Sequence, residues 1–573
     1  MSAKKSVFDN PVLSTKVKSA NVKIVPEALM GYLVGPFCGL LANSLFGTYL
    51  ISYFREVLFA DEIAAGNTGV NVFITIFPMI SAILIVAGNL LAGQIIERTK
   101  TKAGKARPYI LLSAVVLAVA SVLMFIQPLP DNTTFKMIWL VIAYNLFYAV
   151  AFPLYNTANS ALVPVSTRNG KQRGLLASLA NMAVLGGAGA GSIIFPQIIA
   201  ALAKGFPGPS DSQPNSNGYL IMFIVIGVVT FIGCLAQYYF TRERVTEESM
   251  IKAATPEAEE VKVKGPSLKK QAKAIFTDKF FMVTIIFYLL YQLSGSIKNA
   301  SMKPFTDAIY AATELGAANA MSILGIVGAV PMAVAIVFVA PLCNKFGKRI
   351  VVFAGMALGV VGGVIAGIWY DNFIALAVGV ALKCLGSAPA GYMILAMIAD
   401  CLDHMEAKNG FRCDGFGMSL YSAILIAAVP LATGIGSGLA ATSYGTVVAY
   451  IWIETGAYAL CAITVLFFGV EKHLSADREA ILARQKAEAE AAGIEWIEPE
   501  ERLRLEEEEN DRLAEEARKA ELKARCEKKG LSYEEEEAKY QAKLEEKRKV
   551  AEAKKQAAEE KRRAAEERKN KKD

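Results

Sequence analysis

Histidine is scarce in this chain of 573 residues, and its cysteines are isolated. The two histidines are His404 and His473, and none of the eight cysteines belongs to a C-x-x-C pair. Because metal sites and disulfide frameworks need several such residues at short spacings, we expect neither. The sequence also lacks a nucleophile–base pair and a phosphate-binding glycine loop. It therefore predicts a protein that is not an enzyme and holds no cofactor.

Charge is also nearly absent from long parts of the sequence. Charged residues make up 20% of the chain, but they crowd into the N-terminal segment, a few loops and the residues after 470. The remainder consists of apolar stretches, each close to the roughly 20 residues that a helix needs to cross a bilayer. There are twelve such stretches, at 29–54, 69–96, 108–127, 136–161, 175–203, 218–240, 279–300, 318–342, 350–369, 373–399, 415–441 and 446–470. The sequence therefore predicts an all-α integral membrane protein with twelve transmembrane helices in a lipid bilayer. The net charge of +7 then reflects loops and tail, and does not indicate nucleic-acid binding.

Lysine and arginine are distributed unevenly between the loops. The loop 97–107 carries five cations, and every second loop after it is also cationic. The loops between these are poor in lysine and arginine. Since cationic loops stay in the cytoplasm, we expect both termini there and the protein in the plasma membrane. We expect no cleavable signal peptide, because the first apolar run is long enough to remain as an anchor.

The charged segment 241–278, which contains Pro256 and Pro266, divides the spans six and six. Two half-bundles joined by such a linker are typical of the major facilitator fold. We therefore expect an N-terminal cytoplasmic segment, a first half, a cytoplasmic linker, a second half and a charged helical tail. These parts are residues 1–28, 29–240, 241–278, 279–470 and 471–573.

Two loops carry motifs that resemble those of a known family. Residues 99–109 read T-K-T-K-A-G-K-A-R-P-Y, while residues 399–404 and 410–415 read A-D-C-L-D-H and G-F-R-C-D-G. These motifs resemble elements of the glycoside–pentoside–hexuronide:cation symporters, the melibiose permease family, at matching loops. The resemblance covers residues 30–470. It implies a secondary transporter of a sugar or glycoside that works by alternating access and is coupled to Na⁺ or H⁺.

The same resemblance implies residues that switch the conformation. A second loop of glycine and cations, at 344–349, lies after span eight where the first lies after span two. We expect the switch residues to be Gly93, Lys105, Arg107, Asp400, Asp403, Arg412 and Asp414. The alternative for these loops is that their charges only set the orientation of the protein in the membrane.

The positions of the family's cation-binding charges hold uncharged residues in this chain. Its helix-two carboxylates fall at Ile85 and Asn89, and its helix-four aspartate falls at Asn156. Two further charged positions fall at Leu40 and Ile426. A sodium site usually includes a carboxylate and a proton relay uses titratable side chains, so the sequence leaves open whether transport is coupled to Na⁺, to H⁺ or to neither.

Polar side chains within the spans are candidates for binding the solute. An unsatisfied polar group in hydrocarbon costs several kcal/mol, so such residues tend to face the bundle interior. Most of them are neutral donors and acceptors, which suit an uncharged, hydroxyl-rich solute. The candidates are Asn43, Asn89, Tyr155, Asn156, Asn159, Gln292 and Lys383. The alternative for each is a hydrogen bond between neighbouring helices.

Lys383 is the candidate that carries a charge. It stands near the middle of span ten, where a charge is expensive and indicates function by default. Its alternative role is an ion pair with Glu454 of span twelve or a bond to a helix carbonyl. Lys298 lies near the end of span seven, from where its side chain could reach the interface. The glycine- and proline-containing patch 386–391 predicts an interruption of span ten.

Residues 471–573 are dominated by Glu, Lys, Arg and Ala. Dense pairs of opposite charge at i,i+4 favour solvated single helices, and no sustained heptad pattern supports a coiled coil. The basic final third could instead contact anionic lipid or a cytoplasmic protein. Two rival functions remain open. One is transport of an amphipathic, lipid- or steroid-like solute, and the other is a non-transporting membrane sensor that acts through its tail.

Overall fold

The computed structural model describes all residues except 1–14, 20, 100, 102, 128–131, 209–213, 247–266, 412, 492–495, 543, 547–548 and 550–573. In this part of the chain, eleven helical segments are long and apolar enough to cross a membrane. The predicted span 108–127 corresponds to a shorter apolar helix, α4 (Arg107–Leu123), of 17 residues. This length is at the lower end for a spanning helix, about 17–25 residues. The predicted all-α membrane fold is confirmed, and each predicted span coincides with a helical segment.

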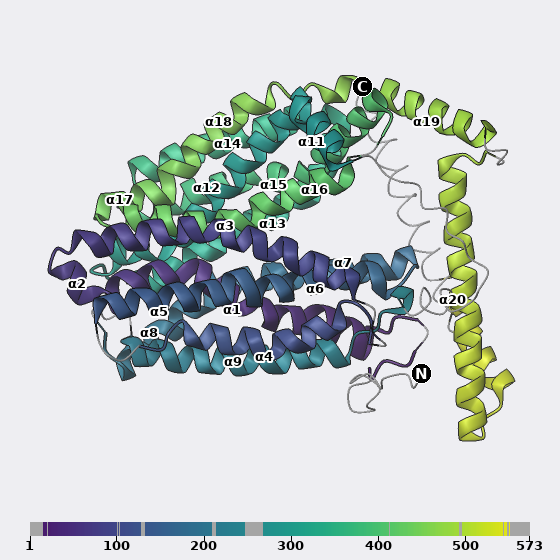
Figure 1. The fold of residues 1–573 in the computed structure, drawn as a ribbon, viewed down its shortest axis with the longest axis horizontal. Helices are drawn as coiled ribbons and strands as arrows, with labels where there is room; N and C mark the ends of the chain where they lie inside the picture. The colour runs from purple at the N-terminus through teal and green to yellow at the C-terminus, as the bar shows by residue number, and fades with distance from the viewer. Residues whose placement is uncertain are drawn as a thin grey trace, which may run out of the picture. The chain divides into compact units, whose positions relative to one another are not determined.

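The first six spans form the N-terminal half (Figure 1). A short helix, α2 (Ala60–Ala64), follows the first span. The spans are η3 (Ile24–Val34), α1 (Gly35–Ser52) and η4 (Tyr53–Leu58); α3 (Thr68–Arg98); α4; α5 (Thr133–Asn145), η5 (Leu146–Ala151) and α6 (Phe152–Ser166); α7 (Gly170–Gly189), η6 (Ala190–Ile194) and α8 (Phe195–Gly205); and α9 (Ser216–Tyr239).

The last six spans form the C-terminal half, which α11 (Leu268–Thr277) precedes. The spans are α12 (Lys279–Tyr310); α13 (Ala317–Phe346); α14 (Lys348–Ile368); α15 (Phe373–Asn409); α16 (Asp414–Leu439); and α17 (Ser443–Val447), η7 (Val448–Trp452) and α18 (Ile453–Val465), followed by η8 (Val470–Lys472). Spans seven and ten end at residues 310 and 409, later than the predicted 300 and 399. These helices continue past the end of the apolar run, so the length of that run does not determine where they end. α15 ends at Gly410, whose φ of +78° gives the left-handed cap that favours glycine.

Asparagine and aspartate side chains determine where several spans begin. Asn67 accepts a hydrogen bond from the N–H of Val70 at the start of α3, and Asp278 does the same for Phe281 at the start of α12. Asn372 accepts from the N–H of Ile374 at the start of α15. Each side chain satisfies a backbone donor that has no partner within the helix.

α15 is one continuous helix, so the predicted interruption of span ten is wrong. The glycines of the patch 386–391 instead allow α15 to pack closely on α14. A Cβ placed on Gly386 would lie 2.4 Å from the carbonyl oxygen of Gly355, and a Cβ on Gly355 would lie 2.5 Å from that of Gly386. Small residues that let helices approach are typical of membrane bundles.

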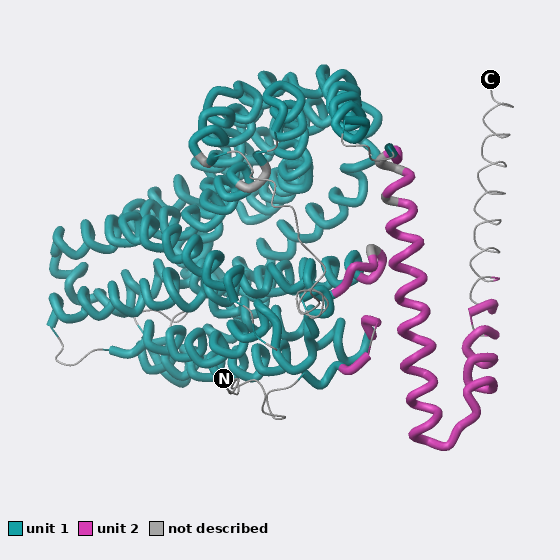
Figure 2. Tube along the Cα trace, turned by 45° about the vertical axis from the view of Figure 1, so that its right-hand side comes forward, with its two compact units in different colours: residues 1–17, 24–166, 173–496 teal, residues 18–23, 167–172, 497–573 magenta. Residues whose placement is uncertain are grey.

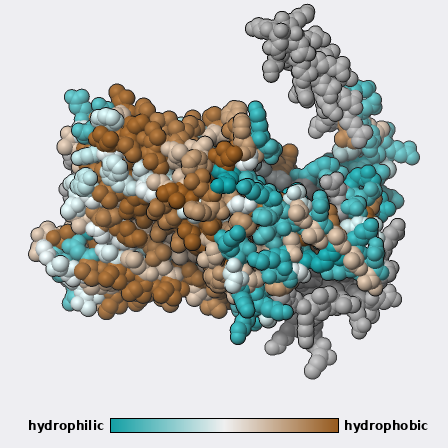
Figure 3. All heavy atoms as spheres, turned by 90° about the horizontal axis from the view of Figure 1, so that it is seen from above, coloured by the Kyte–Doolittle hydropathy of each residue, from teal (hydrophilic) through white to brown (hydrophobic). Residues whose placement is uncertain are grey.

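The outer surface of the bundle is apolar. Ile83, Val337 and Ile374 each expose more than two thirds of their surface. Figure 3 shows apolar side chains gathered over much of one face. A continuous apolar surface of this extent is unfavourable in water and fits contact with lipid tails.

The C-terminal tail belongs mostly to a second compact unit, formed by residues 18–23, 167–172 and 497–573 (Figure 2). Its main element is α20 (Pro499–Lys529). Within this unit, Asp511 accepts hydrogen bonds from Lys171 (2.9 Å) and Asn169 (2.6 Å), and both bonds hold the pKa of Asp511 below its ordinary value. Lys23 pairs with Glu521 at 2.9 Å. The predicted solvated helix is thus present in the described part of the tail, and the basic residues 550–573 lie outside it.

Candidate functional site

We call the end of the bundle with loop 97–107 and residues 345–349 the cationic end, and the end with α2 and α17 the opposite end. The two halves meet at the opposite end (Figure 1). At the opposite end, Arg55 donates to the carbonyl oxygen of Ser437 (2.9 Å), and Ser322 donates to that of Ile193 (2.8 Å). α3 of the first half also packs on α16 of the second. These contacts hold the halves together at this end.

A cavity of about 230 Å³ lies between the two halves. It is bounded by apolar side chains from α3, α12 and α16. They are Val86, Leu289, Leu293, Ala423, Ile424, Ala427, Ala428 and Leu431. Its volume is just below the range of about 300–1,000 Å³ that is usual for small-molecule sites.

Two of the predicted binding residues lie on the helices that line this cavity. Asn89 follows Val86 by three positions on α3, and Gln292 follows Leu289 by three positions on α12. Residues three apart share a helix face, so Asn89 and Gln292 each lie on the same face of their helix as a residue of the cavity wall. Both side chains are half-buried. The Nδ2 of Asn89 donates to the carbonyl oxygen of Ile85 in its own helix (3.1 Å).

The other candidates of the N-terminal half have different surroundings. Tyr155 is fully buried and donates to Oε1 of Gln237 on α9 (2.8 Å), and Nε2 of Gln237 donates to Oδ1 of Asn159 (2.7 Å). One glutamine thus joins two residues of α6 to α9, the arrangement expected of an interhelical contact. Asn43 on α1 and Asn156 on α6 are half-buried.

Lys383 forms an ion pair within the C-terminal half. Its Nζ lies 2.7 Å from Oε2 of Glu454 and donates to the carbonyl oxygen of Tyr450 (3.4 Å). Lys383 and Glu454 are 0% and 1% exposed. The ion pair with Glu454, which was the alternative role from the sequence, is therefore present.

Lys298 belongs to the same cluster. Its Nζ lies 3.4 Å from Oε1 of Glu454, and its side chain is 20% exposed. Because α12 continues to Tyr310, Lys298 lies within the helix and not at its end. The hydroxyl of Tyr458 also donates to Oε1 of Glu454 (2.9 Å).

The motif loop of the first half is built around a carboxylate that sequence reasoning missed. Glu243, which follows α9, accepts hydrogen bonds from the backbone N–H groups of Lys105 (2.9 Å), Ala106 (2.8 Å) and Arg107 (2.8 Å). These are donors at the beginning of α4, where the helix dipole also favours negative charge. Gly104, with φ of +107°, brings the loop against this carboxylate.

Arg107 lies on the other side of the same loop. Its guanidinium donates to the carbonyl oxygens of Ala103 (3.0 Å) and Tyr238 (2.9 Å) and stacks over the ring of Tyr238. It is 2% exposed. The predicted switch residues Lys105 and Arg107 thus tie α4 to the end of α9.

The second half repeats this arrangement. Glu471, which follows span twelve, accepts from the N–H of Lys348 (2.6 Å) and of Arg349 (3.4 Å) at the beginning of α14. Gly347, with φ of +83°, precedes them as Gly104 does in the first half. The side chain of Lys348 pairs with the predicted switch residue Asp400. An acidic residue just after the last span of each half is the sequence signal that identifies both carboxylates.

The remaining switch candidates are Gly93, Asp403, Arg412 and Asp414. Around Gly93, no atom lies within 4 Å of an added Cβ. Asp403 is half-buried on α15, Asp414 begins α16, and Arg412 lies outside the described residues.

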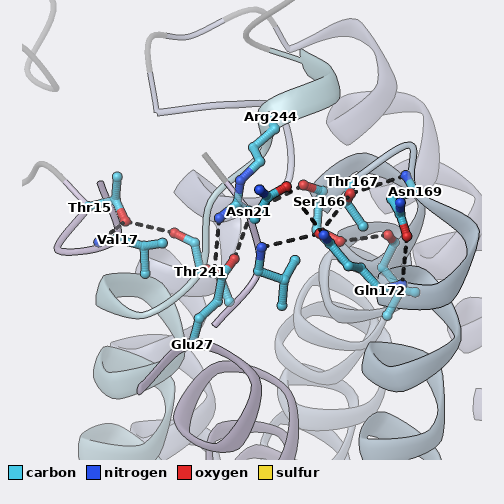
Figure 4. Close-up of polar contacts among 12 residues, drawn as sticks. Thr15, Val17, Asn21, Glu27, Ser166, Thr167, Asn169, Gln172, Thr241 and Arg244 are labelled. Atoms are coloured by element: carbon cyan, nitrogen blue, oxygen red, sulfur yellow. Dashed lines mark hydrogen bonds and ion pairs between the residues drawn. The ribbon is translucent and has the colours of Figure 1, made fainter. Parts of the chain in front are cut away.

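A buried ion pair also ties the start of span one to the end of span six. Arg244 binds Glu27 with two hydrogen bonds of 2.7 and 2.8 Å, and it donates to the carbonyl oxygen of Ser166 (Figure 4). Beside it, the hydroxyl of Thr15 donates to the carbonyl oxygen of Thr241 (2.9 Å). The cationic end of the N-terminal half is therefore fixed by bonds within that half.

Two repeated six-span halves that meet at one end around a cavity define a membrane transporter of the major facilitator type. Solved structures with this fold include nucleoside transporter NupG, with a TM-score of 0.52 and 12% identity over 78% of this chain and 100% of that one. The D-xylose-proton symporter has a TM-score of 0.51 and 16% identity over 77% of this chain and 97% of that one.

The chain belongs to the MFS/sugar transport protein family, whose model matches residues 31–468. It is 26% identical to an isoprimeverose transporter of Lactiplantibacillus pentosus, over 80% of this chain and 92% of that protein. It is 21% identical to a lactose permease of Leuconostoc lactis, over 82% of this chain and 73% of that protein. The predicted family, fold and transport function are confirmed.

Proposed function

We propose that this protein is a secondary transporter that moves a sugar or glycoside across the plasma membrane by alternating access. The observation that carries the proposal is the cavity between two halves that are bonded to each other near one end. Rocking of the halves about the cavity would break the bonds at that end and open the cavity on that side. The relatives named for isoprimeverose and lactose transport support a sugar as the solute.

The distribution of charge supports the orientation of the protein in the membrane. The cationic end would face the cytoplasm, with both termini on that side. The bonds of Arg55 and Ser322 would then close the outer side. In this orientation, the structure corresponds to a transporter closed to the outside.

We propose Asn89 and Gln292 as the residues that bind hydroxyl groups of the solute, with Asn43 and Asn156 as further candidates. Asn89 and Gln292 each share a helix face with a residue of the cavity wall. We assign Tyr155 and Asn159 to the contact between α6 and α9, because Gln237 binds both. Lys383 would act on the solute only through Glu454, its ion-pair partner.

The test is uptake by the purified protein in proteoliposomes. Radiolabelled isoprimeverose, lactose and sulfoquinovose would be offered to vesicles preloaded with the same unlabelled sugar; the third sugar is named in a further relative, a putative sulfoquinovose importer of Escherichia coli. We expect one of them to exchange across the membrane, and Asn89→Leu and Gln292→Leu to raise its apparent KM at least tenfold. If the protein is inserted and monodisperse but exchanges none of the three sugars, the result contradicts sugar transport.

A second candidate function is transport of an amphipathic solute. The observation that favours it is the apolar wall of the cavity, which is formed by leucine, isoleucine, valine and alanine side chains. The same vesicles would be offered a radiolabelled steroid glycoside. Its exchange, together with failure of the three simple sugars, would favour this function. Failure of all four solutes would favour the membrane sensor.

A further inference from the structure

The strongest feature that the transport proposal leaves unused is the cluster of Lys298, Glu454 and Lys383. Two ammonium groups share one carboxylate, at 3.4 and 2.7 Å; the lysines belong to α12 and α15, and the carboxylate belongs to α18. With all three groups ionised, the cluster carries one surplus positive charge. An uncompensated charge is expensive within a membrane bundle, so such a cluster calls for an explanation.

In the described part of the chain, Glu454 is the one carboxylate that pairs with either lysine of the cluster. The titratable groups that face it are Tyr291 on α12, Cys384 on α15, Tyr450 on η7 and Tyr458 on α18. None of these is an acid that ionises near neutral pH. The helices packed against α12 from the other side add no anion at this level, because α1 carries no charged residue and the charged residue of α16 is Asp414, at its start.

The first half offers no titratable group where the family's cation site lies. At the corresponding positions, this chain has Ile85, which is 2% exposed, and the neutral Asn89 and Asn156. The cluster in the second half is a place in the described spans where a proton could be gained and lost without leaving an unpaired anion. Removing one proton from Lys298 leaves Glu454 and Lys383 as a neutral pair.

We propose that Lys298 carries a proton that this transporter moves together with its solute. In the loaded state Lys298 is an ammonium ion. In the empty state it is a neutral amine. The nitrogen lone pair takes a proton from water on the outer side and returns it to water on the inner side, and no bond of the solute is made or broken. Of the three charged side chains, Lys298 is the one with an exposed part, 20% against 1% and 0%.

The coupling follows from the surroundings of α12. This helix packs on α1 of the other half and contributes Leu289 and Leu293 to the cavity wall, so its environment changes when the halves rock. A hydroxyl-rich solute brings polar atoms and water to this helix, which stabilises the ammonium ion. An empty, closed cavity offers only apolar walls, which favour the neutral amine. The halves then rock with both proton and solute, or with neither.

The inference rests on the proposed function, and its test uses the sugar that wild-type vesicles exchange best. A pH difference of one unit, acid outside, would be imposed at clamped membrane potential. One proton per sugar gives about tenfold accumulation, since one pH unit corresponds to a factor of ten. Lys298→Arg is the decisive variant, because arginine keeps the positive charge but does not lose its proton.

We expect Lys298→Arg and Lys298→Met to exchange sugar within about threefold of the wild-type rate while accumulation falls to about one, because exchange needs no net proton transfer. Lys298→Met is expected to fold, since it leaves Glu454 with Lys383. Lys279→Arg, at the start of the same helix, is the matched control and should accumulate like the wild type. Tenfold accumulation by Lys298→Arg would overturn the inference. Wild-type exchange without accumulation would also overturn it while leaving sugar transport intact, whereas loss of wild-type exchange would overturn both proposals.

Discussion

Glu243 and Glu471 hold equivalent positions in the two halves. Each follows the last span of its half, and each carboxylate accepts backbone N–H groups at the beginning of that half's third span, α4 or α14. In both places a glycine with positive φ precedes the donors, Gly104 in one and Gly347 in the other. The repeat shows that the glycine–lysine loops after spans two and eight are structurally equivalent. It also shows that each loop is fixed by a residue more than one hundred positions away in sequence.

Glu243→Ala should destabilise the protein more than Glu471→Ala. Glu243 is 1% exposed and accepts three backbone donors, all of which would lose their partner. Glu471 is half-buried, so water can replace part of its contribution. We expect a loss of about 1–3 kcal/mol for Glu243→Ala and less for Glu471→Ala. Thermal unfolding of the purified protein, followed by thiol-reactive dye fluorescence, measures the difference. Equal melting temperatures for the two variants would contradict it.

Gly104→Ala and Gly347→Ala should both lower the melting temperature, whereas Gly93→Ala should not. A positive φ costs a residue with a side chain about 1–2 kcal/mol, and a Cβ on Gly104 would also lie 2.3 Å from Cδ of Glu243. The corresponding contact at Gly347 is 3.2 Å, so the loss should be larger at Gly104. Gly93 lies inside α3 with open space around it, and alanine favours helix there. An unchanged melting temperature for Gly104→Ala would show that the loop can adjust to the added methyl group.

Most of the membrane fold could be predicted from the sequence, because hydrocarbon leaves few alternatives to long apolar helices. The ends of spans seven and ten could not, since they depend on local features such as the left-handed cap at Gly410. The glycine patch 386–391 predicted a break in α15 but serves the packing on α14. Glycine has both uses in membrane helices, and the choice depends on a neighbour 30 residues away in sequence, such as Gly355.

The candidate site could be predicted less completely. The sequence shows which residues of the spans are polar, but it does not tell which helix each side chain faces. Asn89 and Gln292 share a helix face with residues of the cavity wall, while Tyr155 and Asn159 bind Gln237. The cluster around Glu454 depends on three helices that meet in space, so the sequence indicated the pair with Lys383 but not the second lysine.

Gly434→Val should shift the protein toward the conformation that is open at the opposite end. A Cβ on Gly434 would lie 2.4 Å from the carbonyl oxygen of Thr75 and 2.5 Å from Cγ of Met79, so a branched side chain would separate α16 from α3. A cysteine introduced at Ser437, near the same end, reports the change through its rate of alkylation from outside. We expect at least a fivefold faster rate with Gly434→Val than without it. Gly456→Val, where no atom lies within 4 Å of an added Cβ, is the control. An unchanged rate would show that the halves stay closed there.

Truncation of the tail should destabilise the protein when it removes α19 (Leu474–Ala491), the helix that follows the last span, but not when it begins after α19. α19 packs on the end of α15, where His404 lies 2.7 Å from Asp477 and Arg484 lies 2.6 Å from Glu406. Glu406 is buried, so losing Arg484 would remove a hydrogen-bond partner of its carboxylate at a cost of about 1–3 kcal/mol. A chain that ends at residue 473 should therefore melt at a lower temperature than the full chain.

A chain that ends at residue 496 keeps both pairs and loses exposed ion pairs such as Lys171–Asp511, which are worth about 0–1 kcal/mol. We expect it to melt within a few degrees of the full chain and to exchange sugar at the same rate. If this longer chain inserts normally but no longer exchanges sugar, the tail takes part in function, and the membrane-sensor alternative gains support.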